Sequence, residues 1–211
     1  MAIDDKQRVH QIILKCAKLY ESNLNGKNFM YVIRGIDNVP FTFEVQFTTP
    51  RFLHLMGVNT KLSVTEFYEY CINERLSETQ HTLKPDGYTI QKSTVSIELM
   101  GIHKRAKMYG ESALLFTDKM IGNVRGCVGF RLIDGARFHY PNTLLEADIK
   151  KTTDDYLPIL AVYQKLISES LYSVICYKSN IYKDIEYNML TWLEEIQKRI
   201  DMTNLISSIG T

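Results

Sequence analysis

One short segment of the chain places a histidine close to an arginine. His54 follows Arg51 by three residues, so a helix would carry both side chains on one face. An imidazole beside a guanidinium can move a proton while the positive charge stabilises a developing negative charge, which suits phosphate chemistry. The neighbours Phe52, Leu53 and Leu55 are apolar, and a histidine among apolar residues is also common as a hydrogen-bonded packing residue.

A second segment, Tyr140-Pro141-Asn142-Thr143, is rich in hydrogen-bonding groups. Asn142 and Thr143 can donate hydrogen bonds to an oxyanion, and we expect them in an open turn before a helix, whose backbone N–H groups would add to the site. The same residues could instead be no more than the N-cap of that helix. Tyr140 is one of 13 tyrosines. Tyrosines can stack on unpaired bases, but most of these fit half-buried sheet positions.

The remaining histidines and lysines are weaker candidates. We expect His10 on an exposed helix start, His81 in a loop and His103 in a basic run, whereas His139 follows a strand as His54 does. Lys165 and Lys178 lie at the ends of two strands of a predicted hairpin, Lys165 near its turn and Lys178 at the opposite end. Hairpin geometry alone therefore does not bring them to one phosphate.

Composition and motifs exclude several classes of protein. The 25 Lys and Arg residues nearly balance the 24 Asp and Glu residues, so the net charge of +1 gives no global attraction to nucleic acid. The sequence has no GxxxxGK[ST] phosphate loop, no GxSxG elbow and no carboxylate cluster suited to magnesium. The four cysteines lack zinc-type spacing, and we expect buried, reduced thiols. We accordingly expect no metal and no cofactor.

The sequence was also searched for a signal peptide and for membrane-spanning segments. The N-terminus has no apolar signal segment, and no apolar run approaches the roughly 20 residues that span a bilayer. We expect a cytoplasmic protein without membrane contact.

Hydrophobic periodicity predicts the elements that must position these side chains. Helices are predicted at residues 3–22, at a short turn after Pro50, at 63–75 behind a capping box, at 95–108, at 144–151 as a short helix or turn, and at 183–201. Strands are predicted at 29–33, 41–47, 112–117, 127–133, 138–140, 158–165 and 171–178. These elements predict one α+β domain over residues 1–211 with a core at about 10–180. Its antiparallel sheet would have four to six strands, with the N-terminal and C-terminal helices packed on it.

The order of several short motifs resembles one family of nucleases. The chain shows in succession Phe52-Leu53-His54-Leu55-Met56-Gly57-Val58, Ser63 with Phe67-Tyr68, Lys119-Met120-Ile121-Gly122-Asn123, Gly129-Phe130, Tyr140-Pro141-Asn142-Thr143-Leu144-Leu145-Glu146-Ala147-Asp148-Ile149, and Lys165. This order is similar to the fourth subgroup of the phage-barnase-EndoU-colicin-RelE-like nucleases, over residues 10–180. The resemblance implies a barnase/EndoU/colicin/RelE-like α+β fold, metal-independent RNA cleavage, and a phage, mobile-element or toxin and defence context. It also implies a site that draws on His54, the Asn142-Thr143 turn and Lys165.

The first hypothesis is a metal-independent endoribonuclease acting on tRNA or mRNA. His54 would be the general acid or base, Arg51 and Lys165 would stabilise charge, and Asn142 and Thr143 would position the phosphate. Further substrate contacts would come from three side chains, Tyr140, Lys150 and Lys178. An immunity protein or another protein partner, and a homodimer, are compatible with this hypothesis.

Two alternatives remain open. Met56 stands where the family more often has threonine, and together with the neutral charge it favours a non-catalytic RNA- or protein-binding module that keeps only the fold. A nucleotide-binding regulator using the same pocket is the third possibility.

Overall fold

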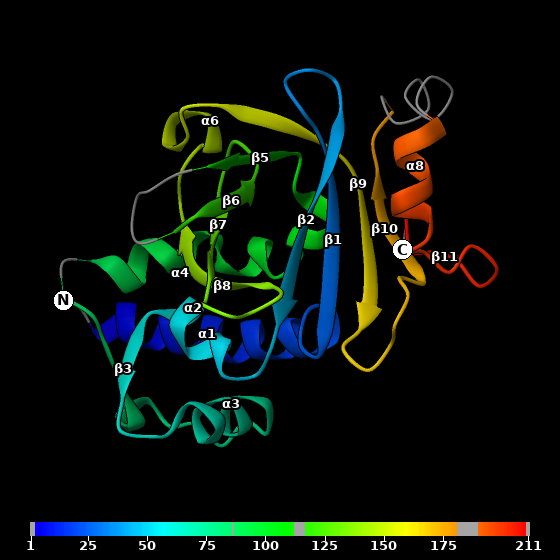
Figure 1. The fold of residues 1–211 in the computed structure, drawn as a ribbon. Helices are drawn as coiled ribbons and strands as arrows, with labels where there is room; N and C mark the ends of the chain where they lie inside the picture. The colour runs from blue at the N-terminus through cyan, green and yellow to red at the C-terminus, as the bar shows by residue number, and fades with distance from the viewer. Residues whose placement is uncertain (1–2, 86, 112–116, 181–189, 210–211) are drawn as a thin grey trace.

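The structure is a computed structural model that describes residues 3–85, 87–111, 117–180 and 190–209. Within these residues the chain forms an α+β fold (Figure 1). It begins with the long helix α1 (Ile3–Asn23), and a turn at Gly26, whose φ of +72° lies in the left-handed region, leads into the first strand. No helix in the described part of the chain is both long and apolar enough to cross a membrane.

Seven strands pair in a closed ring. Their order is β1-β2-β8-β7-β6-β5-β9, and β9 pairs again with β1. Their bounds are β1 (Lys27–Arg34), β2 (Pro40–Phe47), β5 (Met108–Glu111), β6 (Lys119–Gly122), β7 (Cys127–Leu132), β8 (His139–Leu145) and β9 (Tyr156–Leu166). The ring is antiparallel except between β2 and β8, where Val45 pairs with His139 in parallel. Closure gives β1 a hydrogen-bonded neighbour on both sides.

Strand β1 is buried on both faces and separates two parts of the core. Phe29, Tyr31 and Ile33 pack into the main cluster, together with residues of the helices that follow. Met30 and Val32 point to the other face, into a second cluster. Side chains alternate across a strand, so one continuous apolar run serves both clusters.

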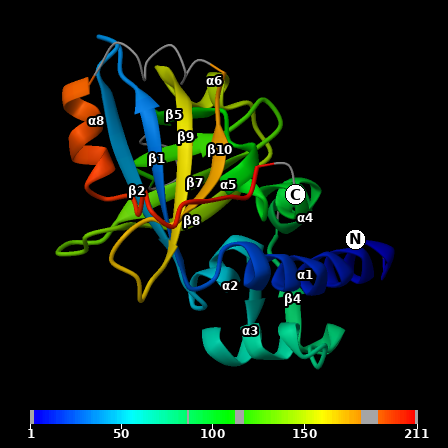
Figure 2. The ribbon, with the colours of Figure 1, turned by 90° about the vertical axis from the view of Figure 1, so that its right-hand side faces the viewer.

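Most of the helices lie on the side of the main cluster. Figures 1 and 2 show α1 beneath the strands and α3 beneath α1. Here lie α2 (Arg51–Met56), α3 (Val64–Ile72), α4 (Tyr88–Leu99), the 3-10 turn η1 (Glu78–Gln80) and the two-stranded sheet of β3 (Val58–Thr60) and β4 (His81–Leu83). Helix α3 begins as expected, because Ser63 and Glu66 form a reciprocal capping box.

The second cluster is covered by the C-terminal part of the chain. Helix α8 packs against it through Ile196, and the following turn adds Ile200 (Figure 2). The elements on this side are β10 (Val174–Lys178), α8 (Leu190–Gln197) and β11 (Ile206–Ser207), and the short helices α5 (Ile102–Arg105) and α6 (Ile149–Thr152) complete the fold.

Several predictions are confirmed. The first helix, the first two strands, the short helix after Pro50, the capped helix behind Ser63 and the hairpin of β9 and β10 lie where the sequence predicts them. The four cysteines are free and buried. The C-terminal helix is confirmed at Leu190–Gln197, whereas its predicted start at 183–189 and most of the predicted strand at 112–117 lie outside the described residues.

The expected sheet of four to six antiparallel strands is wrong in size and type. The described residues form a mixed sheet of nine strands, with parallel pairings between β2 and β8 and between β10 and β11. The 11-residue strand β9 pairs with β1 along one edge, and with β5 and then β10 along the other. One long strand thereby joins what local patterns present as separate hairpins.

Two helix predictions also differ from the structure. The helix expected at 95–108 is α4, which starts earlier, at Tyr88, and gives way at Met100 to the short α5. The helix or turn expected at 144–151 is wrong in its first half, because Leu144 and Leu145 belong to β8. Their pairing with β7 shifts register between Gly129 and Phe130, which leaves Asn142 as the extra residue of a bulge.

Candidate active site

Helix α2 presents Arg51 and His54 on its outer side. Pro50 lies just before the helix, and Gly57 ends it in the left-handed conformation with its N–H bonded to the Leu53 carbonyl. Phe52, Leu55 and Met56 are buried on the inner side. Because Arg51 and His54 are three residues apart, they share the opposite side, where His54 is exposed and Arg51 is half-buried.

Arg51 reaches across to strand β8. Its guanidinium carbon lies 4.7 Å from the centre of the Tyr140 ring, a cation–π contact. Arg51, Tyr140 and Asn142 line one groove of about 340 Å³, together with residues of the β7–β8 turn. The structure therefore brings three of the predicted residues to one place.

Thr143 lies next to this groove and connects it to helix α4. The predicted open turn at Asn142 and Thr143 is wrong, because both residues are in strand β8, and the expected helix N-terminus is absent there. Thr143 is only 3% exposed, and its hydroxyl lies 3.4 Å from the Tyr88 hydroxyl. A second groove of about 360 Å³ begins here, lined by Tyr88, Lys92 and the end of β8.

Lys92 connects helix α4 to helix α2. It is 3% exposed, and its ammonium donates a hydrogen bond of 3.3 Å to the His54 carbonyl. The same ammonium lies 4.5 Å from the centre of the Tyr88 ring, one helical turn before it. We call Arg51, His54, Tyr88, Lys92, Tyr140 and Thr143 the α2–α4–β8 cluster.

Gly57 makes this close approach possible. A Cβ atom at this position would lie 2.9 Å from Cδ of Lys92 and 3.1 Å from Cε1 of Tyr88. Its φ of +64° is also one that side-chain-bearing residues rarely adopt. Both reasons make glycine the fitting residue between α2 and β3.

The electrostatics of the cluster follow from its positive charges. Desolvation lowers the pKa of His54 below its ordinary value, and the charges of Arg51, Lys84 and Lys92 lower it further. A histidine with a pKa below 6.5 is neutral at neutral pH, so His54 can accept a proton there. Burial lowers the pKa of Lys92, and the hydrogen bond to Tyr88 opposes this shift.

The Tyr88 phenol is more acidic than an ordinary tyrosine. Burial alone would raise its pKa, but hydrogen bonds with Lys92 and Thr143 and the charges of Lys92 and Lys84 outweigh burial and lower it. The Lys84 ammonium lies 5.4 Å from the ring centre. A phenol held in this way releases its proton more readily.

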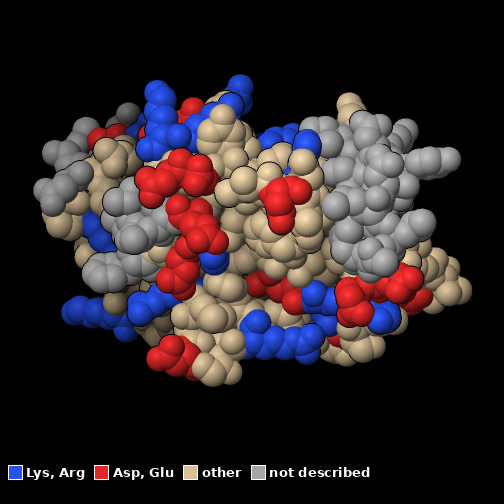
Figure 3. Space-filling view, turned by 45° about the horizontal axis from the view of Figure 1, so that its top comes forward, with Lys and Arg blue, Asp and Glu red and all other residues tan. Residues whose placement is uncertain are grey.

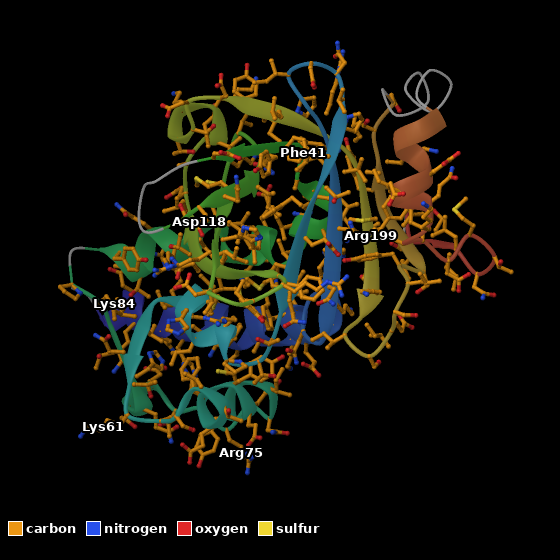
Figure 4. All side chains as sticks on the ribbon, in the orientation of Figure 1. Phe41, Lys61, Arg75, Lys84, Asp118 and Arg199 are labelled. Atoms are coloured by element: carbon orange, nitrogen blue, oxygen red, sulfur yellow. The ribbon has the colours of Figure 1, made fainter. Side chains whose placement is uncertain are left out.

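The structure does not bring Lys165 to the α2–α4–β8 cluster. Lys165 pairs with Asn28, on the face of β1 that carries Met30 and Val32, and its ammonium donates to the Ser170 carbonyl at 2.9 Å. Its neighbours in charge include Arg199, whereas those of His54 include Lys84. Figure 4 shows Lys84 and Arg199 on opposite sides of the molecule.

The other two predicted lysines also lie elsewhere. Lys150 is exposed in α6, with its ammonium 5.0 Å from the centre of the Tyr156 ring. Lys178 ends strand β10, opposite Ala161 of β9. Neither lines the two grooves beside β8.

A comparison with protein-family models shows which family this chain belongs to. Residues 12–181 match the model described as phage-Barnase-EndoU-ColicinE5/D-RelE like nuclease4. The chain belongs to this nuclease family. The resemblance inferred from the motif order is thereby confirmed. Neither the comparison with curated proteins nor the comparison with solved structures gives a significant match.

In this family member, the cluster includes two residues that the sequence did not single out, Tyr88 and Lys92. The available signal was their four-residue spacing directly after the Lys84-Pro85 turn, which places both on one face of a helix. The apolar pattern instead predicted a helix start at residue 95, which left both residues outside the predicted helix. No group of three or more metal-ligating residues occurs in the described part of the nuclease chain.

The other histidines of the nuclease have structural surroundings. The expectation that His10 is exposed and that His81 lies in a loop is wrong, because both rings are buried and stack on each other, and their facing nitrogens are 3.0 Å apart. His103 packs on Phe29 with ring centres 5.3 Å apart. His139 lies in β8, its ring 4.8 Å from that of Phe43.

Proposed function

We propose that this protein is a metal-independent endoribonuclease whose active site is the α2–α4–β8 cluster. The observation that supports this most directly is that Arg51 and Tyr140 line one groove, with His54 one turn from Arg51 on the outer side of α2 and with Thr143 and Lys92 nearby. A proton acceptor and a cation are two of the groups that RNA cleavage needs, an aromatic ring can bind a base, and membership of a nuclease family favours their use on a nucleic acid.

RNA supplies its own nucleophile, so the protein needs few groups. Neutral His54 accepts the proton of the 2′-hydroxyl as its oxygen attacks the adjacent phosphorus. Arg51 stabilises the negative charge that builds up on the phosphate oxygens. The products are a 2′,3′-cyclic phosphate and a 5′-hydroxyl end.

Tyr140 fits the role of a base platform. Arg51 covers its ring at 4.7 Å, and every nucleobase has a flat face that can stack on an aromatic ring. Stacking is tolerant of sequence, so we expect unpaired RNA to be the preferred substrate. Asn142, in the same groove, would donate to the phosphate or the sugar.

A substitution of His54 tests this function. In EDTA, the purified protein should cleave single-stranded RNA and leave 2′,3′-cyclic phosphate ends, whereas His54→Ala should be inactive with an unchanged circular dichroism spectrum. The matched control is His139→Ala, since the His139 ring packs against Phe43 and lines neither groove. It should retain cleavage.

The alternative is a module that binds RNA without cutting it. A wild-type protein that binds RNA oligonucleotides but never cleaves them would favour that alternative. Equal cleavage rates in wild type and His54→Ala would refute the role of the histidine.

A further inference from the structure

The proposed reaction needs two proton transfers, and His54 accounts for only one. One group must take the proton of the 2′-hydroxyl, and another must give a proton to the departing 5′-oxygen, because an alkoxide is a poor leaving group. Since the pKa of His54 is lowered, its imidazole is neutral at neutral pH and serves as the acceptor. A separate donor is therefore required close to the same phosphate.

Tyr88 has the geometry of such a donor. It is the first residue of α4, half-buried, and it lines the groove that continues along β8 from the Thr143 position. Its hydroxyl lies 3.4 Å from that of Thr143, a second group on the strand that also carries Tyr140. The Tyr88 phenol therefore lies beside the groove, and its contacts hold its hydroxyl in one direction.

Lys92 serves the phenol rather than the substrate. Its side chain is 3% exposed, and the ammonium is directed at the His54 carbonyl and at the Tyr88 ring. A fixed positive charge beside a phenol stabilises the phenolate that proton donation creates. The hydrogen bond to the His54 carbonyl also fixes the spacing between the two helices that carry His54 and Tyr88.

We propose that Tyr88 is the general acid of this site, donating its phenolic proton to the 5′-oxygen, with Lys92 and Thr143 as its positioning residues. This inference rests on the proposed function. In the step, the bond between phosphorus and the 2′-oxygen forms and the bond between phosphorus and the 5′-oxygen breaks. The 2′-hydroxyl proton goes to His54, and the Tyr88 proton goes to the 5′-oxygen. Water then takes the proton from His54 and returns one to Tyr88.

The lowered pKa of Tyr88 agrees with this role. A phenol with a lowered pKa is a stronger acid than an ordinary tyrosine, and a histidine with a lowered pKa is neutral at neutral pH. The two shifts fit Tyr88 as the donor and His54 as the acceptor. They also predict a bell-shaped pH profile, with its acidic limb below pH 6.5 and its alkaline limb below pH 10.

The leaving group provides the test. Two substrates are compared, an RNA dinucleotide and uridine 3′-(4-nitrophenyl phosphate), whose nitrophenolate departs without a proton. Tyr88→Phe should lose about 10²–10³-fold of its kcat/KM on the dinucleotide and at most about 3-fold on the nitrophenyl ester. His54→Ala should lose activity on both substrates.

A matched control and a second variant complete the design. Tyr70→Phe removes a phenol that also lies beside a cation, with the Arg75 guanidinium carbon 5.3 Å from its ring centre, but on α3 and outside both grooves; it should leave both rates within about 2-fold. Replacement of Tyr88 by a fluorotyrosine keeps the shape of the ring while acidifying the phenol. It should move the alkaline limb to lower pH.

The possible results distinguish failure of the Tyr88 role from failure of the proposed function. An equal loss on both substrates in Tyr88→Phe, a dinucleotide rate within about 3-fold of wild type, or an unmoved alkaline limb in the fluorotyrosine protein would overturn the role of Tyr88 and leave the proposed function standing. A wild-type protein that cleaves neither substrate would instead refute the proposed function, and the role of Tyr88 with it.

Discussion

The surroundings of Lys92 and Lys165 differ in kind although both side chains are buried. Lys92 is 3% exposed, faces a carbonyl and a phenol ring, and lines one groove at the surface. Lys165 is 6% exposed, covers Tyr172 at 5.0 Å and donates to Ser170 within its own hairpin. We expect a buried cation to take part in function only when its contacts lie beside a groove that a ligand can enter.

Lys165 lies beside a network of side chains that pair with one another. Tyr172 donates a hydrogen bond of 2.6 Å to Glu44, and Arg199 forms an ion pair with the same carboxylate. Arg199 also donates to Thr42 at 3.2 Å. These contacts join β2, the β9–β10 connection and the segment after α8, so this region stabilises the fold.

Charges of both signs lie on the face of the molecule in Figure 3, where acidic side chains gather in several patches between basic ones. A groove of about 710 Å³ is lined by Asp37, Glu111, Asp154 and Asp155, among other residues. A groove of this sign repels a polyanion, whereas the groove of the proposed site carries Arg51 and Arg131.

The largest expected effect is a difference in activity between variants of Lys92 and of Lys165. Lys92→Met should lower kcat/KM on RNA by about 10²–10³-fold, because a preorganised cation beside the reacting groups is lost. Lys165→Met should leave kcat/KM within about 3-fold and lower the melting temperature instead. Steady-state kinetics and thermal denaturation of both variants measure this, and reversed results would invalidate the comparison.

The next effect concerns the acid stability of the fold. Burial lowers the pKa of His103 from 6.5 to about 3, and the charges of Lys104 and Lys27 act in the same direction. Between these values the unfolded chain binds one proton more than the folded one, so stability falls as the pH drops below 6.5. From pH 6.5 to 4.5 the loss should be roughly 2 kcal/mol for this residue.

The variant His103→Phe isolates this contribution. Urea titrations at several pH values should show a shallower acid dependence than in wild type. Identical acid slopes for His103→Phe and wild type would contradict the burial argument.

A third, smaller effect compares two tyrosines under cations. Tyr140→Leu should raise KM for single-stranded RNA by about 10-fold, since a stacking platform is worth about 1–3 kcal/mol per base. Tyr172→Leu removes the ring beside Lys165 and should change stability but not KM. A KM that is the same for Tyr140→Leu and wild type would exclude stacking on Tyr140.

The smallest effect concerns glycine. Gly57→Ala should cost roughly 1–2 kcal/mol and lower activity, because the new methyl group meets Lys92 and Tyr88 in addition to the strained φ. Gly135→Ala is the matched control, since its φ is +77° and nothing lies within 4 Å of the new Cβ. It should cost about 1 kcal/mol with full activity. Equal activities of the two variants would show that the space at Gly57 is not needed.

Much of the fold could be predicted because local patterns agree with it. Strand β2 alternates as a half-buried strand must, and Pro50 and Gly57 mark the two ends of α2. That short helix put Arg51 and His54 on one face, so half of the site followed from spacing alone.

The other half could not be predicted because it lies on a polar buried face. The inward side of α4 carries Thr89, Lys92, Ser93 and Ser96, whose side chains hydrogen-bond to nearby carbonyls. Apolar periodicity cannot reveal a helix of this kind. Long-range pairing explains the remaining differences, since the ring closes through β1 and β9, more than a hundred residues apart.

One measurement tests the central claim most directly. A DNA oligonucleotide with a single ribonucleotide is incubated with the protein in EDTA, beside an all-DNA control. The account predicts one cut, directly 3′ of the ribonucleotide, with a 2′,3′-cyclic phosphate end and no cut in the control or with His54→Ala. Cleavage of the all-DNA strand, or activity that appears only with a divalent metal, would contradict it.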